Sequence, residues 1–397
     1  MAAVSQSSST NVAELAIRVN TKGSASNHGA FGSGDEVAGE VEVSTRDEAR
    51  IETVRVYLTG KARTRVEHIV WAMPSIMKKR LLRMHQTIRP SGDDAALPAQ
   101  GKRTFQFSLT IPHGLPETHC LCPPMNDDDH LQVPPTMGGW HRWEHDGEIL
   151  SDPTPDMVEV CYKVTAIATL KDPEGRSTTA ETAQRICIVP SFPEAPPQFS
   201  SSYRIREESI VKRNILSNRL GCLVMEAQPP SALKGIKSGN AVSCRVLVRF
   251  DPASHEWGPP PADGIMRKIH VTTIYTSGAA LAADNSDGQE RSYTDAISLP
   301  PFNLSGVQWL KKYPGWEHMQ LSHGRMTPSE VIAPSAGYVG GVYYLLKLSI
   351  PVEFPAGKIL VPTFRSCLVS RTYELEISLS LSSTAPISVR FPLQICT

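Results

Sequence analysis

The sequence has few of the features that mark disulfide-stabilised or membrane-spanning proteins. Its eight cysteines are scattered over 397 residues, far below the density of a disulfide scaffold. No apolar run approaches the roughly 18 residues that a transmembrane helix needs. Met1 is followed by polar Ser and Thr residues rather than by an apolar signal core. We therefore expect a cytoplasmic chain with reduced thiols, which meets membranes only at their surface.

The chain also lacks an excess of charge of either sign. Forty Lys and Arg residues balance forty Asp and Glu residues, so the formal net charge is zero. Proteins that bind nucleic acid usually carry a positive field over the whole molecule. We expect no nucleic-acid partner, and any basic surface must be local.

Helical segments are scarce, because 32 Pro and 27 Gly residues interrupt most windows of helical length. Alternation of apolar and polar residues, which is typical of strands with one wet face, recurs throughout the chain instead. The clearest alternating segments are 105–111, 158–170, 242–250, 373–381 and 387–395. The sequence therefore predicts an all-β protein built from antiparallel strands.

The length predicts two domains, because single domains rarely exceed about 250 residues. A Pro-rich run that contains Pro190, Pro193, Pro196 and Pro197 is typical of a semi-rigid spacer. We place the boundary there, which gives two consecutive immunoglobulin-like β-sandwich domains over residues 1–195 and 196–397.

A basic run lies in a segment whose secondary structure is ambiguous. Between Ile76 and Ile88 the apolar residues fit either a helical stripe or a strand face, and the surrounding strands favour a strand. The cations of this run are Lys78, Lys79, Arg80 and Arg83. They suit anionic lipid head groups or acidic, phosphorylated cargo. The alternative is a solvated strand face without a partner.

Several strings, in this order, resemble the arrestin family. In the N-terminal half, 34–43 is a strand entered by a Gly-Asp turn, 51–62 is closed by a Gly, and 105–112 ends in Ile-Pro. The other N-terminal strings are the opening strand 14–20, the V-x-Y-x-V-x-A strand 158–170 and the last strand before the interdomain connection, 185–190. The strings 221–233 and 371–381 resemble elements of the C-terminal arrestin domain. Their order and spacing across both halves carry the resemblance. It covers nearly the whole chain.

The resemblance implies a non-catalytic cytosolic adaptor or scaffold of the arrestin-related trafficking type, with no cofactor. Such adaptors bind membrane-protein cargo and recruit endocytic or ubiquitin-ligase partners, in the cytoplasm or peripherally at the plasma membrane or endosomes. One departure concerns the ligase link. Adaptors of this type commonly carry PPxY motifs, whereas no Pro-Pro pair of this chain is followed by Tyr at the required position.

An enzyme on the same scaffold is the competing hypothesis. The loop from Cys120 to His145 holds Asp128, His141 and Trp143, which could converge on a pocket. The same loop has enough His and Cys for zinc, but its spacing matches no known finger, and a reduced-thiol loop is the alternative. We assign no catalytic residue and no metal ligand.

Two tryptophans of this loop are costly to expose. Trp140 and Trp143 lie in the string WHRWEH, next to two glycines. Large aromatic rings either pack over an edge of the sandwich or form a contact site for a partner. Both interpretations stay open from the sequence.

The missing PPxY motif predicts that WW domains do not bind this chain directly. WW grooves of this class need the Tyr ring as an anchor, so polyproline II segments alone give little affinity. Titrating the purified protein against an array of isolated WW domains checks this, with a PPxY peptide as the positive control. Micromolar binding to the protein would contradict the prediction.

Overall fold

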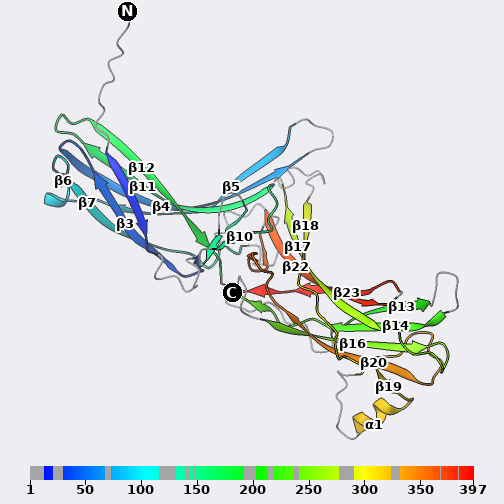
Figure 1. Cartoon of the computed structure of the whole chain (residues 1–397). Coiled ribbons are helices and arrows are strands. Elements are labelled where there is room, and N and C mark those ends of the chain that lie inside the picture. Colours follow the sequence, from blue (N-terminus) through cyan, green and yellow to red (C-terminus); the bar gives the residue numbers. More distant parts are fainter. Residues whose placement is uncertain are drawn as a thin grey trace, which may run out of the picture.

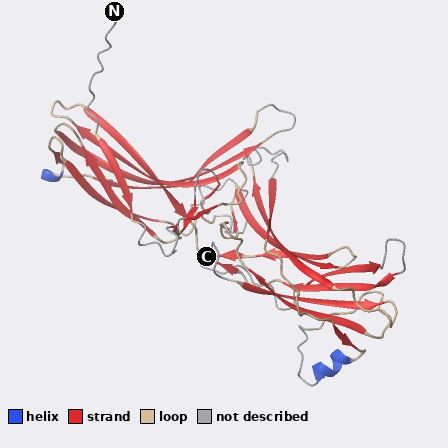
Figure 2. Ribbon diagram, in the orientation of Figure 1, coloured by secondary structure: helices blue, strands red, loops and turns tan. Residues whose placement is uncertain are grey.

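The computed structural model describes residues 13–20, 30–67, 73–115, 131–138, 143–145, 148–191, 203–212, 219–235, 241–276, 290–322, 331–366, 368–382 and 384–397. Nearly all regular structure in these ranges is β-strand, as Figure 2 shows. The predicted all-β sandwich fold is confirmed. No helix in the described ranges is long and apolar enough to cross a bilayer.

Most strands of the first half lie in the upper-left lobe of Figure 1, while β5 extends from it toward the right and β10 lies near the centre. Two of its sheets have the strand orders β1-β3-β7 and β2-β12-β11-β4-β5. The elements are β1 (Glu14–Val19), β2 (Ala30–Phe31), β3 (Glu36–Ser44), β4 (Ala49–Val66), β5 (Ser75–Ile88), the 3-10 helix η1 (Gly92–Asp94), β6 (Ala96–Leu97), β7 (Lys102–Thr110), β8 (Met137–Gly138), β9 (Trp143–His145), β10 (Glu148–Leu150), β11 (Val158–Lys171) and β12 (Ser177–Ile188). The segment 76–88 is therefore a strand, as predicted.

The strands of the second half lie in the lower-right lobe of Figure 1. Its two five-stranded sheets follow the paths β13-β14-β16-β20-β19 and β18-β17-β22 with β21 and β23 beside β22. The elements are β13 (Ile205–Lys212), β14 (Arg219–Gln228), β15 (Leu233–Lys234), β16 (Val242–Pro252), β17 (Ala262–Tyr275), β18 (Arg291–Ser298), β19 (Leu310–Lys312), α1 (Trp316–Ser322), β20 (Tyr343–Val352), β21 (Phe364–Arg365), β22 (Val369–Leu381), β23 (Ile387–Leu393) and β24 (Ile395–Cys396). The predicted boundary at 195/196 lies outside the described residues and stays a prediction.

Each lobe encloses a large apolar cluster between its sheets. The alternating residues named by the sequence supply the inward faces, because successive side chains of a strand point to opposite sides. The N-terminal cluster also includes residues from the second half, such as Tyr275, Val361 and Phe364. The two lobes are therefore joined by shared apolar packing.

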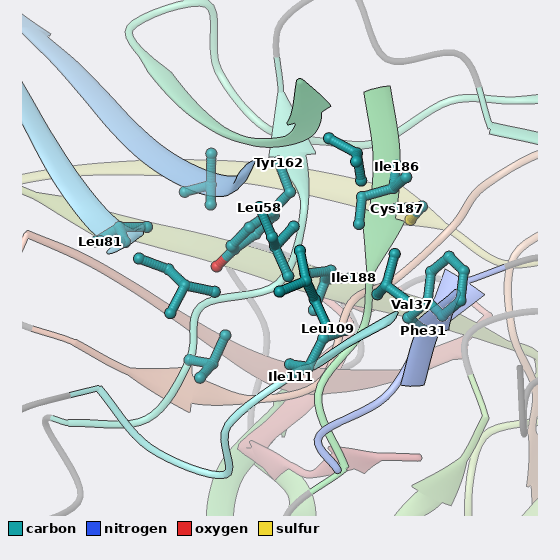
Figure 3. Packing of buried hydrophobic residues seen from close by; sticks show 14 of the residues in the cluster. Phe31, Val37, Leu58, Leu81, Leu109, Ile111, Tyr162, Ile186, Cys187 and Ile188 are labelled. Atoms are coloured by element: carbon teal, nitrogen blue, oxygen red, sulfur yellow. The ribbon is translucent and has the colours of Figure 1, made fainter. Parts of the chain in front are cut away.

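A buried tyrosine lies at the centre of each cluster. Tyr162 on β11 and Tyr373 on β22 are 1% and 2% exposed. The Tyr162 hydroxyl donates to the Pro134 carbonyl at 2.7 Å, and the Tyr373 hydroxyl donates to the Val361 carbonyl at 2.6 Å. Figure 3 shows the ring of Tyr162 beside Leu58. The predicted inward orientation of both rings is confirmed.

Replacing Tyr162 or Tyr373 with Ala should lower the free energy of unfolding by about 3–5 kcal/mol. The cavity and the carbonyl left without its hydrogen bond add to the loss of buried apolar surface. Tyr→Phe at either position removes only the hydrogen bond and should cost about 1–2 kcal/mol. Chemical denaturation measures both changes. A loss for Tyr→Ala no larger than that for Tyr→Phe would contradict the packing role of the ring.

Candidate functional site

The basic run lies on β5, the last strand on the path of its sheet. Lys78, Arg80 and Arg83 are exposed, whereas Lys79 is half-buried on the opposite side of the strand. Strict alternation would place Arg83 on the other face from Lys78 and Arg80, because positions of odd and even number point to opposite sides. A local irregularity must therefore bring Arg83 to the exposed face.

That irregularity is a β-bulge between β4 and β5. Gly60 pairs with Leu82 and the next residue, Lys61, pairs with Arg80, so Leu81 is an extra residue without a partner in the register. A bulge of this kind shifts the alternation by one position. Leu81 and Leu82 consequently both point into the core. Arg83 returns to the same face as Lys78 and Arg80.

The neighbouring strands extend this positive surface. In register, Arg80 lies opposite Lys61, Lys78 lies opposite Arg63, and Lys163 lies opposite Arg185. We call the set of outward cations on β4, β5, β11 and β12 the basic face: Lys61, Arg63, Arg65, Lys78, Arg80, Arg83, Lys163 and Arg185. Like charges that lie directly opposite each other destabilise a sheet. Their accumulation here therefore lowers stability, which favours a role in binding an anionic partner.

Few described carboxylates offset the charge of the basic face. Arg63 lies 3.9 Å from Glu159, and Arg65 lies 3.0 Å from Glu67. Arg83 instead lies over the ring of Tyr57, at 5.2 Å from its centroid. The face keeps a net positive charge.

A thiol at the centre of the basic face does not reduce this charge. Cys161 lies opposite Lys61 and is partly buried. Burial, followed by the nearby Glu159, raises the pKa of the Cys161 thiol above its ordinary value. The thiol stays protonated at neutral pH, so it adds no negative charge.

The spacing of the basic face makes its cations act together on a partner. Adjacent strands lie about 4.8 Å apart, and alternate residues along a strand lie about 6.7 Å apart. Both spacings fall within the Debye length of about 8 Å at physiological salt. An array of this kind attracts an anionic surface or an acidic segment without a deep pocket.

A second polar site joins the two lobes. Arg371 on β22 is fully buried, and its Nη2 donates to Thr154 Oγ1 at 2.5 Å. Its Nη1 lies 3.7 Å from Asp152 Oδ1. The Asp152 carboxylate also accepts hydrogen bonds from the backbone N–H groups of Gly138 and Thr154. This charge pair links residues from the two halves of the sequence.

Other polar contacts surround the same joint. Thr64 Oγ1 donates to the Thr276 carbonyl at 2.6 Å. Ser151 exchanges two backbone hydrogen bonds with the other lobe, donating to Gly357 at 3.0 Å and accepting from Ile359 at 3.1 Å. The joint therefore combines apolar packing with directional hydrogen bonds, which favours one relative placement of the lobes.

The remaining predicted site residues belong to the loop between 120 and 145. Asp128, Trp140 and His141 lie outside the described residues. Trp143 begins the short strand β9, and only its backbone is described. Within the described ranges no group of His, Cys, Asp and Glu could hold a metal ion. The hypotheses of an enzyme pocket and of an aromatic contact site stay predictions.

Sequence reasoning named three of the eight cations of the basic face and missed the other five, and it missed the whole interdomain pair. The signal for the first was partly present, because Lys61, Arg63 and Arg65 alternate at the end of the predicted strand 51–62 and directly beyond it. The signal for the second was absent, since Asp152 and Arg371 are far apart in the sequence and only the packing of the lobes brings them together.

Comparison with protein families agrees with this architecture. Residues 21–122 match the model of the arrestin (or S-antigen) N-terminal domain. Over these residues the chain is similar to the arrestin N-terminal domain. The match covers β2 to β7, which include the bulged pair β4 and β5. None of the curated proteins matches the chain. The arrestin-like family indicates a non-enzymatic, adaptor-like role in general terms.

The interdomain pair predicts an asymmetric response to substitution in this arrestin-like chain. Asp152→Ala leaves the buried Arg371 charge without its carboxylate and should cost about 3–5 kcal/mol. Arg371→Met removes the charge and fills the space, so its cost should be smaller. Chemical denaturation measures both variants. Glu174→Ala, at an exposed ion pair, is the control and should change little. Equal losses for Asp152→Ala and Arg371→Met would contradict this account.

Proposed function

We propose that this arrestin-like chain is a non-catalytic adaptor that binds acidic or phosphorylated segments of membrane-protein cargo through the basic face. The observation that carries the proposal is the bulge beside Gly60, which brings Arg83 onto the same face as Lys78 and Arg80. Alignment of like charges does not stabilise a strand face that has no partner. It does strengthen the attraction of the face for an anionic partner.

The chemistry of the basic face suits this class of partner. Arg guanidinium groups donate paired hydrogen bonds to carboxylate and phosphate, and Lys ammonium groups add point charges. The face spans four strands, so it fits an extended segment better than a small molecule. Anionic lipid beside the cargo would add to the attraction, at about 1 kcal/mol per cation near the surface.

The same proposal places the protein in the cytoplasm, peripherally at the plasma membrane or endosomes, where cytosolic tails of cargo are accessible. Its role there is in endocytosis and protein transport. Any link to a ubiquitin ligase runs through a bridging partner, because the chain has no PPxY motif. No described feature favours the alternative of an enzyme.

The proposal predicts that membrane-protein partners are lost when the basic face is neutralised. Proximity labelling in cells should recover membrane proteins with the wild type and fewer of them with the triple variant Lys78→Gln, Arg80→Gln, Arg83→Gln. Lys79→Gln is the matched control, because it removes a cation from the other side of the same strand. Equal recovery by the wild type and the triple variant would contradict the role of the face.

Vesicle co-sedimentation, which contains no cargo, tests whether the basic face also binds anionic lipid. We expect weak binding to phosphatidylcholine vesicles that contain phosphatidylserine, none to pure phosphatidylcholine, and loss at high salt, because exposed charges are screened. The triple variant should bind less than Lys79→Gln. Equal binding by both variants would show that the face does not act on anionic lipid.

A further inference from the structure

Among the described residues, segments outside the sheet cover one half of the outward side of the C-terminal sheet β13-β14-β16-β20. Residues 331–341, which we call the strap, lie across this half. Arg249, which is almost fully buried, donates from Nε to Asp251 Oδ1 at 2.7 Å and from Nη1 to the Ile332 carbonyl at 3.3 Å. Its guanidinium lies between the rings of Tyr338 and Tyr343, at 4.7 and 4.0 Å from their centroids.

Two more arginines fix the strap at its beginning. Arg204 donates to the Val331 carbonyl at 2.8 Å, and Arg206 donates to the carbonyls of Ala333 and Pro334 at 2.9 and 2.7 Å. Both arginines also pair with Glu226, at 3.1 and 2.7 Å. The cations under the strap therefore have carboxylate and carbonyl partners.

A hollow of about 410 Å³ lies on the uncovered half of the same sheet. Leu247 connects the two halves, because it belongs to the apolar cluster under the strap and also lines the hollow. The polar residues that line the hollow are Gln228, Ser231, Ser243, Arg245, Lys347 and Ser349. Its described lining contains two cations and no Asp or Glu.

The register places these groups next to one another. Arg245 lies opposite Gln228 on β14 and opposite Ser349 on β20. The hydroxyls of Ser243 and Ser349 are 2.5 Å apart. Guanidinium, ammonium, hydroxyl and amide donors therefore face one volume from three adjacent strands.

The described residues that line the hollow carry a net positive charge. Among the described residues no carboxylate pairs with Arg245. Burial, with a contribution from Lys347, lowers the pKa of Lys312 below its ordinary value. Lys312 lies over the ring of Trp316, with its Nζ 3.7 Å from the ring centroid. The two cations of the described lining, Arg245 and Lys347, therefore favour an anion in the hollow.

The geometry points to a binding site for a phosphomonoester, in which Arg245 and Lys347 hold the phosphate oxygens and the serine hydroxyls donate to them. A phosphomonoester carries nearly two negative charges at neutral pH and three strong acceptor oxygens. This matches two cations and several neutral donors better than a carboxylate does. The site lies on a different sheet and lobe from the basic face and does not depend on the proposed function.

Glycerol 3-phosphate is the probe that tests the site, and titration followed by amide NMR shifts is the measurement. We expect saturable shifts at residues around the hollow. Arg245→Gln and Lys347→Gln should each weaken binding about tenfold or more, since each removes a charge-assisted contact. Lys212→Gln, at the opposite end of the same sheet, is the matched control and should bind as the wild type. Absence of saturable shifts, or equal shifts with acetate, would overturn the proposal.

A second experiment decides whether the phosphomonoester is a lipid head group or a free ligand. Vesicles that contain phosphatidic acid are compared with vesicles of equal charge that contain phosphatidylserine, in the triple variant of the basic face. Preference for phosphatidic acid that Arg245→Gln abolishes, together with binding of glycerol 3-phosphate, supports the site and assigns a lipid head group. Binding of glycerol 3-phosphate without that preference supports the site and assigns a free ligand. Vesicle binding without glycerol 3-phosphate binding contradicts the site.

Discussion

The close approach of Tyr162 to Gly60 determines the outer surface of the N-terminal sheet. Tyr162 lies opposite Gly60, and a Cβ at Gly60 would lie 2.4 Å from the Tyr162 ring. Only glycine fits there, because the ring occupies the space of a side chain. The bulge begins at this residue and turns both Leu81 and Leu82 inward. The alignment of the cations on the basic face therefore depends on the packing of the Tyr162 ring in the core.

The sequence predicted the strands well and the surfaces poorly, for a physical reason. Alternation reports which residues of one strand share a face, so the inward positions of Tyr162 and Tyr373 could be predicted without knowing the neighbouring strands. A bulge depends on two strands at once, and nothing within 75–88 alone reveals it. The cations of the run could therefore be named, but not the face on which each one lies.

Long-range polar contacts were beyond the sequence for a similar reason. Asp152 lies in a loop and Arg371 lies in a strand of the other lobe. Neither residue has a local pattern that marks it as buried. Arg249 likewise lies in a strand where alternation alone cannot distinguish a solvated cation from one enclosed by two tyrosines. Burial of these charges follows from segments that fold over them, and such coverage is a tertiary property.

The zero net charge of the chain conceals a separation of charge across the N-terminal sandwich. The basic face lies on the outer side of one sheet, whereas the outward residues of β3 on the other sheet include Glu36, Glu40 and Glu42. Of these, Glu42 is neutralised by Lys102, at 3.0 Å, and Glu40 lies opposite Arg18 of β1. An anionic partner is therefore attracted to one side of the lobe and repelled from the other. This polarity selects the orientation in which the lobe approaches an acidic surface, which a uniformly charged protein could not do.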